Sequence, residues 1–349
     1  MNETTHDQGR DDAFAGRVLY VARAPFVSGA ERALVTMLRH LDRDRVEPGL
    51  VLGAETSLVE IAASLDIPVW IVPTVKRELR QVIAWWRSLR QLSRVVAKFQ
   101  PSVLHANDVP SCQAMCRVGL EDGLPRVVHV RWTIDAEAAS WWARDGVEQV
   151  LCISQWIEQQ LGDTAGTTLA DADVRVLHDA VDWPATDVDA PPLTWSPPDE
   201  PTIGFSGQLI ESKGLDLVIE AMGRLEPNER PRLLVAGEDT QTGGAYKEQL
   251  QTLAERRGVA DDIDWLGFLD DVTDLHRRVT AMVCPSRVEP LGLVPLEAAR
   301  LGLPTIACGV GGLAETIIDV ETGRRVERNV EPWDKVLRRV SDCEAMIAM

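Results

Sequence analysis

No apolar run in this chain of 349 residues approaches the roughly 18 consecutive residues that a membrane-spanning helix needs. Residues 1–15 are polar and acidic, and they have neither the basic region nor the apolar stretch of a secretory signal peptide. Internal repeats and low-complexity tracts are absent as well. The sequence therefore predicts an ordinary globular protein that begins with a disordered leader.

Basic residues are scarce, because 36 Lys and Arg stand against 54 Asp and Glu, which gives a net charge of −18. Nucleic-acid binding needs a basic footprint, so this balance argues against that class of partner. The six cysteines are scattered, and four of them lie inside apolar runs. We expect reduced, buried thiols in a cytoplasmic protein. No second pair or histidine cluster accompanies Cys112 and Cys116, which favours helix packing over a metal site.

Strand-like apolar runs alternate with helix-like stretches along most of the chain, which is the pattern of parallel βαβ units. The exception is residues 182–201, which contain six prolines and no helical period. The sequence therefore predicts an α/β protein in which two Rossmann-like, doubly wound domains face each other across an interdomain cleft. The expected parts are a first domain at 16–182, a linker at 183–200, a second domain at 201–330, and at 331–349 a short C-terminal helix able to cross back to the first domain.

Ligands of doubly wound sheets bind at the carboxyl ends of the strands, so the positions of the strands decide where a site can form. In the first domain we expect strands at 17–22, 46–53, 67–73, 102–107, 126–131 and 147–154. In the second domain we expect them at 202–207, 232–237, 263–268, 281–286 and 304–309.

Two glutamates, Glu289 and Glu297, flank a loop rich in Pro, Leu and Gly after the expected strand at 281–286. Pro295 suits the first turn of a helix, which places Glu297 in that turn and Glu289 near the start of the loop. Gly292 lets backbone amides approach a ligand beside a helix N-terminus, where anions are favoured. Carboxylates for sugar hydroxyls and amides for phosphate together fit a sugar nucleotide. The same spacing also fits a helix-capping glutamate and a solvated loop glutamate.

Three further turns carry a cation or glycines after an expected strand. The stretch 204–214 ends in Lys213 and Gly214, where the lysine can reach phosphate as a point charge. The stretch 307–316 has three glycines, and the stretch 27–32 has one. Glycine lets the backbone come close to a ligand, so each of these turns is a candidate contact.

Together these turns resemble the retaining GT-B glycosyltransferases of family 4, and the resemblance covers residues 16 to 330. Each motif is weak by itself, but their common order on successive strand-to-helix turns makes the signal specific. The motifs are Ser28-Gly29-Ala30-Glu31-Arg32, Ser206-Gly207 with Lys213-Gly214, Pro285-Ser286 with Glu289-x7-Glu297-Ala298, Gly302-Leu303-Pro304, and Gly311-Gly312-Leu313-Ala314-Glu315.

The resemblance implies that Glu297 holds the ribose hydroxyls of the nucleotide and that Glu289 contacts the ring of the donor sugar. Lys213 would neutralise the departing diphosphate, helped by backbone amides at Gly292 and Leu293. The implied reaction transfers a hexose from a UDP- or GDP-sugar to a hydroxyl acceptor, with retained anomeric configuration. Its barrier would fall mainly through charge stabilisation and positioning.

The resemblance also implies that turns at Gly29 and Gly207 approach the donor, the first of them near the acceptor as well. Two positions depart from the family pattern. Members commonly have an arginine where this chain has Gln208, so one positive charge is missing from the donor site. Members often have an acceptor-side histidine where this chain has Arg131, with His129 two residues earlier on the same face of the strand. We expect one of these two residues to reach the cleft.

The family generally needs no metal, because cationic side chains take its place, and we expect no cofactor here. The Asp-x-Asp triplets at 171–173 and 187–189 fall in loop or linker sequence. The stretch 309–314 matches the G-x-G-x-x-G/A dinucleotide fingerprint, but it lies too near the C-terminus to begin a cofactor domain. That position argues against a dehydrogenase.

The stretch 76–100 is basic within an acidic chain, with seven basic residues and one acidic residue. Its arginines recur at helical spacing, and another side of the helix is apolar, formed by Val82, Trp86, Leu89, Leu92 and Val96. A basic amphipathic helix with a tryptophan pair suits anionic lipid headgroups, which would make this a cytoplasmic enzyme peripheral to the inner face of the cell membrane. The alternative, in which the apolar side packs on the sheet and the arginines are solvated, stays open.

Two other functions stay open as well. One is a sugar-nucleotide epimerase of the GT-B type, and the other is a glycosyltransferase-like subunit that binds a partner or a donor without efficient turnover. Gln208 and Arg131 motivate the second. The acceptor can be lipid-linked, a polysaccharide or a small molecule, because the first-domain loops that would select it carry no recognisable signature.

Overall fold

The computed structural model of the chain describes most of both predicted domains. The leader at 1–15, residue 28, residues 76–78 of the basic stretch, most of the linker, both Asp-x-Asp triplets in part or whole, and the last nine residues lie outside the described part. The described residues are 16–23, 27, 29–75, 79–118, 123–136, 146–165, 172–182, 198, 200–269 and 271–340.

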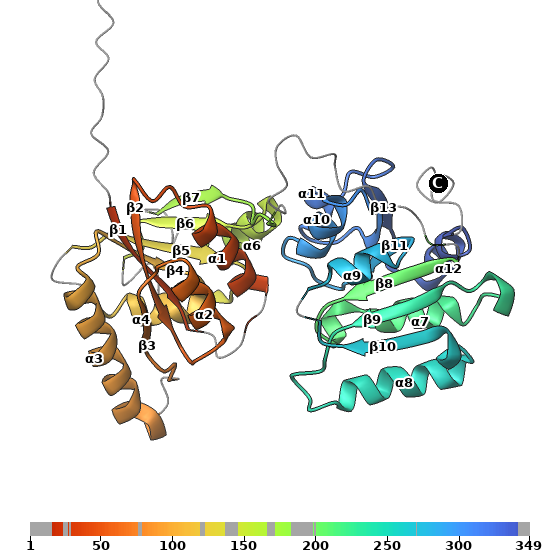
Figure 1. The fold of residues 1–349 in the computed structure, drawn as a ribbon, viewed down its shortest axis with the longest axis horizontal. Coiled ribbons are helices and arrows are strands. Elements are labelled where there is room, and N and C mark those ends of the chain that lie inside the picture. The colour runs from red at the N-terminus through yellow and green to blue at the C-terminus, as the bar shows by residue number, and fades with distance from the viewer. Residues whose placement is uncertain are drawn as a thin grey trace, which may run out of the picture. The chain divides into compact units, whose positions relative to one another are not determined.

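The first sheet has seven strands in the order β3-β2-β1-β4-β5-β6-β7 (Figure 1). Pairing is parallel where β1 meets β2 and β4, where β2 meets β3, and where β4 meets β5. The order reverses beside β1, which is the doubly wound topology expected from the sequence. The strands are β1 (Gly16–Ala22), β2 (Val46–Leu52), β3 (Val69–Ile71), β4 (Val103–Ala106), β5 (Arg126–Val130), β6 (Gln149–Cys152) and β7 (Asp173–Val176).

Helices of the first half begin at local signals in the sequence. The Thr56 hydroxyl accepts a hydrogen bond from the amide of Leu58 at the start of α2, and Asp108 accepts one from the amide of Ser111 at the start of α4. The helices are α1 (Gly29–Arg39), α2 (Ser57–Ser64), η1 (Leu79–Gln81), α3 (Val82–Phe99), α4 (Val109–Met115) and α6 (Gln155–Ala165).

The second sheet has six strands in the order β10-β9-β8-β11-β12-β13, and it reverses beside β8. Five of these strands match the expected runs to within two residues. The sixth, β13, and the seventh strand of the first sheet, β7, are not among the expected strands. The strands are β8 (Thr202–Ser206), β9 (Arg232–Ala236), β10 (Ile263–Gly267), β11 (Ala281–Cys284), β12 (Thr305–Cys308) and β13 (Gly323–Val326).

Helices pack on this sheet and close its core. Trp333 is fully buried in the same apolar cluster as Ile203 of β8 and Val218 of α7. Up to residue 340 the C-terminal segment therefore packs into the core of the second unit, and the return of the C-terminal helix to the first domain stays a prediction. The helices are η3 (Glu211–Lys213), α7 (Leu215–Met222), η4 (Pro227–Glu229), α8 (Ala245–Arg257), η5 (Ala260–Asp262), α9 (Thr273–Arg277), α10 (Leu293–Ala299), α11 (Leu313–Thr316) and α12 (Val330–Leu337).

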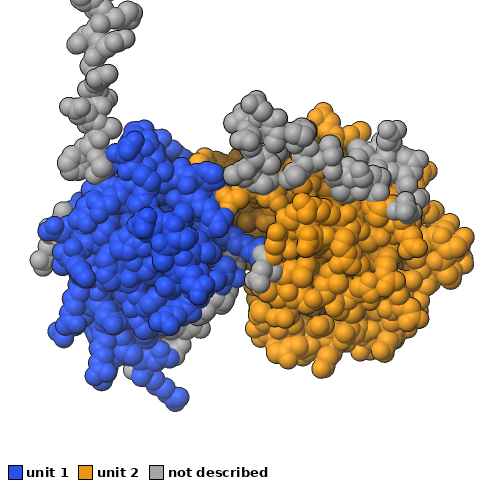
Figure 2. Space-filling model, in the orientation of Figure 1, with its two compact units in different colours: residues 1–130, 134–151, 161–175 blue, residues 131–133, 152–160, 176–349 orange. Residues whose placement is uncertain are grey.

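The chain forms two compact units, coloured separately in Figure 2. The first unit contains the first sheet. The second contains the second sheet and also residues 131–133, 152–160 and 176–182, the stretches at the carboxyl ends of β5, β6 and β7. The predicted boundaries at 182 and 200 stay predictions, because most of the linker between them lies outside the described residues.

Candidate functional site

Three loops of the second unit, which follow β8, β11 and β12, pack backbone against backbone at the carboxyl edge of the sheet. Gly214, with φ of +69°, leaves room for the Pro285 carbonyl oxygen, which would lie 2.1 Å from an added Cβ. Gly311, with φ of +56°, does the same for the carbonyl of Glu289, at 2.2 Å. Both positions need glycine for the conformation and for the space. These glycines, which the sequence predicts to be ligand contacts, therefore allow the loops to pack closely, and their contact with a ligand stays a prediction.

Lys213 and Glu289 meet at this edge. The Nζ atom of Lys213 lies 2.8 Å from Oε2 of Glu289, and the hydroxyl of Ser286 donates to the same oxygen at 3.0 Å. The side chains of Lys213 and Glu289 are 26% and 14% exposed, so the pair is partly shielded from water. The topology explains the meeting, because β8 and β11 are hydrogen-bonded neighbours and their carboxyl-end loops share one edge.

Glu297 is half-buried in the second turn of α10, and not in the first turn as predicted, because the helix begins at Leu293 after the left-handed N-cap residue Gly292, whose φ is +96°. Burial raises the pKa of the Cys284 thiol at the end of β11, and the carboxylate of Glu289 raises it further. The charge of Lys213 lowers that pKa and the carboxylate of Glu297 raises it. The three predicted donor-site side chains are thus all near enough to act on one thiol. Leu293, the first residue of α10, is half-buried.

The turn after β8 joins the other two predicted donor contacts. The amide of Gly207 donates to the Ala236 carbonyl of β9 at 3.0 Å. The carbonyl of Gln208 accepts from the amide of Ile210, and the carbonyl of Ile210 accepts from the amide of Lys213, both at 3.0 Å. Gln208 is half-buried in this turn, which places its uncharged side chain on the same short loop as the lysine.

Arg287 is a member of this site that the sequence did not nominate. Its guanidinium forms a two-pronged ion pair with Asp216, at 2.8 and 2.6 Å, and donates to the carbonyl of Glu211 at 2.5 Å. Hydrogen bonding to Asp216 raises the pKa of Arg287. Its amide also donates to the carbonyl of Ser212 at 2.7 Å. Arg287 therefore fixes both sides of the turn that carries Lys213, and no spacing pattern in the sequence indicates this.

The remaining candidates are Gly29, His129 and Arg131. Gly29 is exposed at the start of α1. The side chain of His129 is buried, with its ring 5.9 Å from that of His105 on β4. Arg131 belongs to the second unit, where its guanidinium pairs with Asp179 at 3.0 and 2.9 Å and keeps 7% of its exposure. Both side chains are buried, and the expectation that one of them reaches the cleft stays a prediction.

Two doubly wound sheets, the second with a lysine, two glutamates and glycine turns at its carboxyl edge, define the GT-B class. Solved structures share this architecture. HepE from Anabaena in complex with UDP-glucose superposes with a TM-score of 0.78, over 95% of this chain and 94% of that one, at 16% identity. At that identity the likeness establishes the fold alone.

Two family models match consecutive parts of the sequence, Glycosyltransferase Family 4 at residues 27–183 and Glycosyl transferases group 1 at residues 194–346. D-inositol 3-phosphate glycosyltransferase 2 of Catenulispora acidiphila is 35% identical over 137 residues, 37% of this chain and 32% of that protein. The lipopolysaccharide core biosynthesis mannosyltransferase of Rhizobium leguminosarum is 35% identical over 122 residues, 35% of each protein. These matches span about a third of the relatives' length. The chain belongs to the GT-B glycosyltransferases of the family 4 type.

Proposed function

We propose that this protein is a retaining glycosyltransferase that moves a hexose from a nucleoside diphosphate sugar to a hydroxyl acceptor, in glycolipid or polysaccharide synthesis. The observation that carries the proposal is the contact between Lys213 and Glu289 on the carboxyl edge of the second sheet, with Glu297 on α10, the helix that follows the Glu289 loop. A cation for the diphosphate and two carboxylates for hydroxyl groups are the groups that such a donor requires.

In the proposed reaction the diphosphate of the donor binds at Lys213, and Glu297 holds the ribose hydroxyls. Glu289 contacts the hexose and helps to orient its anomeric carbon toward the acceptor hydroxyl. Backbone amides at Gly292 and Leu293 assist as negative charge grows on the departing diphosphate. Prearranged donors and charges of this kind lower the barrier because they need no reorganisation when the bond breaks. No metal has a part in the proposal.

The relatives support a UDP- or GDP-hexose as the donor class. HepE was solved with UDP-glucose, and the Rhizobium leguminosarum relative is named a mannosyltransferase. A thermal-shift panel with UDP, GDP, ADP and NAD tests this choice. A nucleotide at about 100 times its dissociation constant adds about 2.7 kcal/mol, which should raise the melting temperature by roughly 5–10 °C.

The control for this panel is matched to the site. Glu297→Ala should abolish the shift given by UDP or GDP, whereas Glu331→Ala, at an exposed glutamate of α12, should leave it unchanged. A response to no nucleoside diphosphate would contradict the proposal and favour the subunit without efficient turnover. Once the nucleotide is known, proton NMR of the glycoside reports whether the anomeric configuration is retained, and a donor sugar altered without nucleotide release would indicate an epimerase.

We also propose that the enzyme binds an anionic membrane surface through α3. Of the two interpretations of this helix, packing on the sheet fits its C-terminal part and membrane binding fits its N-terminal part. Leu89, Leu92 and Val96 are buried, so the C-terminal part packs on its own domain. Ile83 and Trp86 remain 71% and 57% exposed in the N-terminal part.

The exposed apolar residues of α3 lie beside basic ones. Arg87 and Arg90 are exposed and line one shallow hollow with Ile83 and Trp86. Apolar side chains flanked by cations suit the boundary between headgroups and acyl chains, with about 1 kcal/mol from each cation near an anionic surface. Among the described residues no helix is long and apolar enough to cross a bilayer.

Vesicle flotation tests this second proposal. The full chain should float with vesicles of anionic lipid and remain behind with zwitterionic ones. Ile83→Ser combined with Trp86→Ser should abolish flotation, whereas Phe268→Ser, at a residue of the second unit that is 58% exposed, should not. Flotation that survives the paired substitution would refute a role for α3.

A further inference from the structure

In the loop that carries Glu289, three consecutive carbonyl groups accept hydrogen bonds from neighbouring segments. The carbonyl of Glu289 accepts a hydrogen bond from the amide of Gly312 at 2.8 Å, and that of Pro290 accepts one from the hydroxyl of Ser154 at 2.6 Å. The carbonyl of Leu291 accepts one from the hydroxyl of Thr316 at 3.3 Å. Two of the donors belong to the end of the 307–316 stretch, and the third comes from the start of α6. Hydrogen bonds from two different segments therefore hold the Glu289 loop.

Ser154 is placed for this contact by its own helix. Its hydroxyl accepts from the amide of Ile157 at 3.0 Å, which makes it the N-cap of α6, and its side chain is fully buried. Because one oxygen serves both bonds, the position of the α6 start fixes the direction in which the hydroxyl meets Pro290. A shift of this turn would release that carbonyl, and a buried acceptor without a partner is costly.

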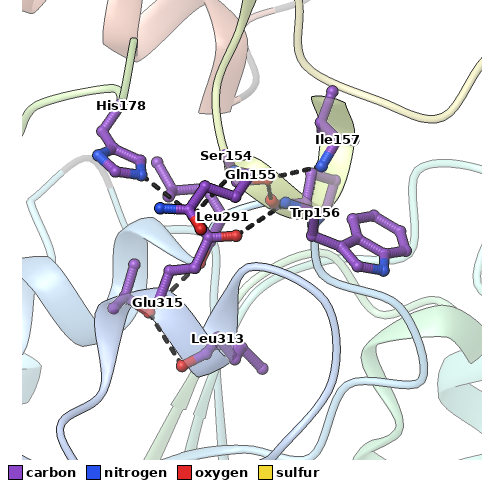
Figure 3. A network of polar contacts seen from close by, with 10 residues as sticks. Ser154, Gln155, Trp156, Ile157, His178, Leu291, Leu313 and Glu315 are labelled. Atoms are coloured by element: carbon purple, nitrogen blue, oxygen red, sulfur yellow. Dashed lines mark hydrogen bonds and ion pairs between the residues drawn. The ribbon is translucent and has the colours of Figure 1, made fainter. Parts of the chain in front are cut away.

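Glu315 determines where the α6 start sits. Its carboxylate accepts from the amides of Gln155 and Trp156, both at 2.9 Å, and its Oε2 atom lies 3.1 Å from Nε2 of His178 (Figure 3). The side chain keeps 19% of its exposure. Hydrogen bonds from amides to a carboxylate are about twice as strong as neutral ones, and a negative charge is favoured at a helix N-terminus.

We propose that Glu315 is a positioning residue of the donor site, which acts through the Ser154 turn and Pro290 on Glu289. Glu315 lies on α11 between Gly312 and Thr316, the two residues that bind the Glu289 loop directly. The hydrogen bonds to its carboxylate hold the Ser154 turn against the other side of that loop. The loop, α11 and the α6 start then form one clamp, and the inference that the clamp serves catalysis rests on the proposed function.

The clamp matters because Glu289 must be placed accurately. Catalytic groups need to be held within about 0.5 Å of their productive position, and a displacement of 1 Å can cost up to about a hundredfold in rate. Lys213 and Ser286 hold the carboxylate of Glu289, but neither restrains the backbone beyond it. The clamp supplies that restraint.

The variants Glu315→Gln, Ser154→Ala and the pair test the proposal in the full chain, with Glu331→Gln as the matched control. Glutamine offers one oxygen where the glutamate offers two, so it loses at least one of the two amide bonds. We expect the release of UDP from UDP-glucose, or of GDP from GDP-mannose, to fall about tenfold in each single variant. The dissociation constant of the free nucleotide should stay within about threefold, and the pair should lose little more than either single variant.

Hydrogen–deuterium exchange gives a readout that needs no substrate. In Glu315→Gln, exchange should rise in the peptide with Gln155 and Trp156, and in Ser154→Ala it should rise in the peptide with Gly312, whose amide donates to the Glu289 carbonyl. Unchanged exchange around Gly312 in Ser154→Ala, or a turnover that stays at the wild-type rate, would overturn the proposal. A wild-type protein that binds neither nucleotide would instead refute the proposed function, and the exchange data would still decide whether the clamp exists.

Discussion

Val320 is a β-branched residue in a left-handed backbone conformation, with φ of +73°. Among the described residues, Asp66 and Gln100 are the other non-glycine positions with positive φ, and neither is β-branched. The turn imposes this geometry, because the amide of Val320 donates to the Gly323 carbonyl at 3.0 Å. Val320→Gly should therefore stabilise the second unit.

The size of this effect follows from two opposed contributions. A non-glycine residue in this region costs about 1–3 kcal/mol of strain, whereas glycine costs about 0.5–1 kcal/mol of additional chain entropy on folding. The valine side chain is 49% exposed, so its removal sacrifices little apolar burial. We expect a net gain of about 1 kcal/mol, which raises the melting temperature by about 2–4 °C for a domain of this size.

Urea unfolding and differential scanning calorimetry measure the gain. The matched control is Ile318→Gly in the same turn, which is 55% exposed and has no positive φ. That variant has no strain to relieve, so only the entropy cost of glycine remains and its stability should fall. Equal changes in the two variants, or a loss of stability in Val320→Gly, would refute the assignment of strain to Val320.

Three other substitutions test separate features of the second unit. Trp333→Ala should cost about 3–5 kcal/mol in the free energy of unfolding by urea, because the indole is fully buried against α7; a cost below 1 kcal/mol would contradict that packing. Burial lowers the pKa of His276 to about 4, below its usual 6.5. Neutral His276 therefore contributes stability above pH 6.5 that is lost as the pH falls toward 4, about 2 kcal/mol between pH 7 and pH 5. His276→Gln should remove that part of the pH dependence of the urea midpoint, and an unchanged slope would refute it. Gln208→Arg should lower the dissociation constant of UDP or GDP measured by calorimetry, and no change would exclude the missing charge as a defect.

Much of the fold follows from the sequence because buried parallel strands read as short apolar runs between helical stretches. The strands that escaped prediction are β7 and β13. The residues of β7, Asp173 to Val176, alternate between exposed and half-buried, and β13 contains two arginines. Both lie at the edge of a sheet, where one side of the strand faces solvent or loops and the apolar signal is lost. The packing of α12 into the core of the second unit could not be predicted either, because an amphipathic pattern does not specify which surface the helix covers.

In the candidate site, too, some contacts can be predicted from the sequence and others cannot. The meeting of Lys213 with Glu289 is predictable, because topology brings the loops after β8 and β11 to one edge of a sheet. The bond between Ser154 and Pro290 joins residues 136 positions apart. It depends on how the stretch 152–160 packs within the second unit, and local periodicity contains no information about that packing. Sequence patterns report which face of an element is apolar, whereas polar contacts between distant loops are set by the completed fold.

The charges of the candidate donor site suit one order of events in the proposed reaction. Lys213 is paired with Glu289, Arg287 is paired with Asp216, and Gln208 is uncharged. In the proposed reaction a diphosphate competes with Glu289 for the ammonium group, because the bidentate pair of Arg287 with Asp216 is harder to open. Binding of the phosphate to Lys213 would release the carboxylate of Glu289 toward the hydroxyl groups of the hexose. This exchange of partners would neutralise the leaving group and free a hydrogen-bond acceptor for the sugar, while the proposed clamp holds that carboxylate in place.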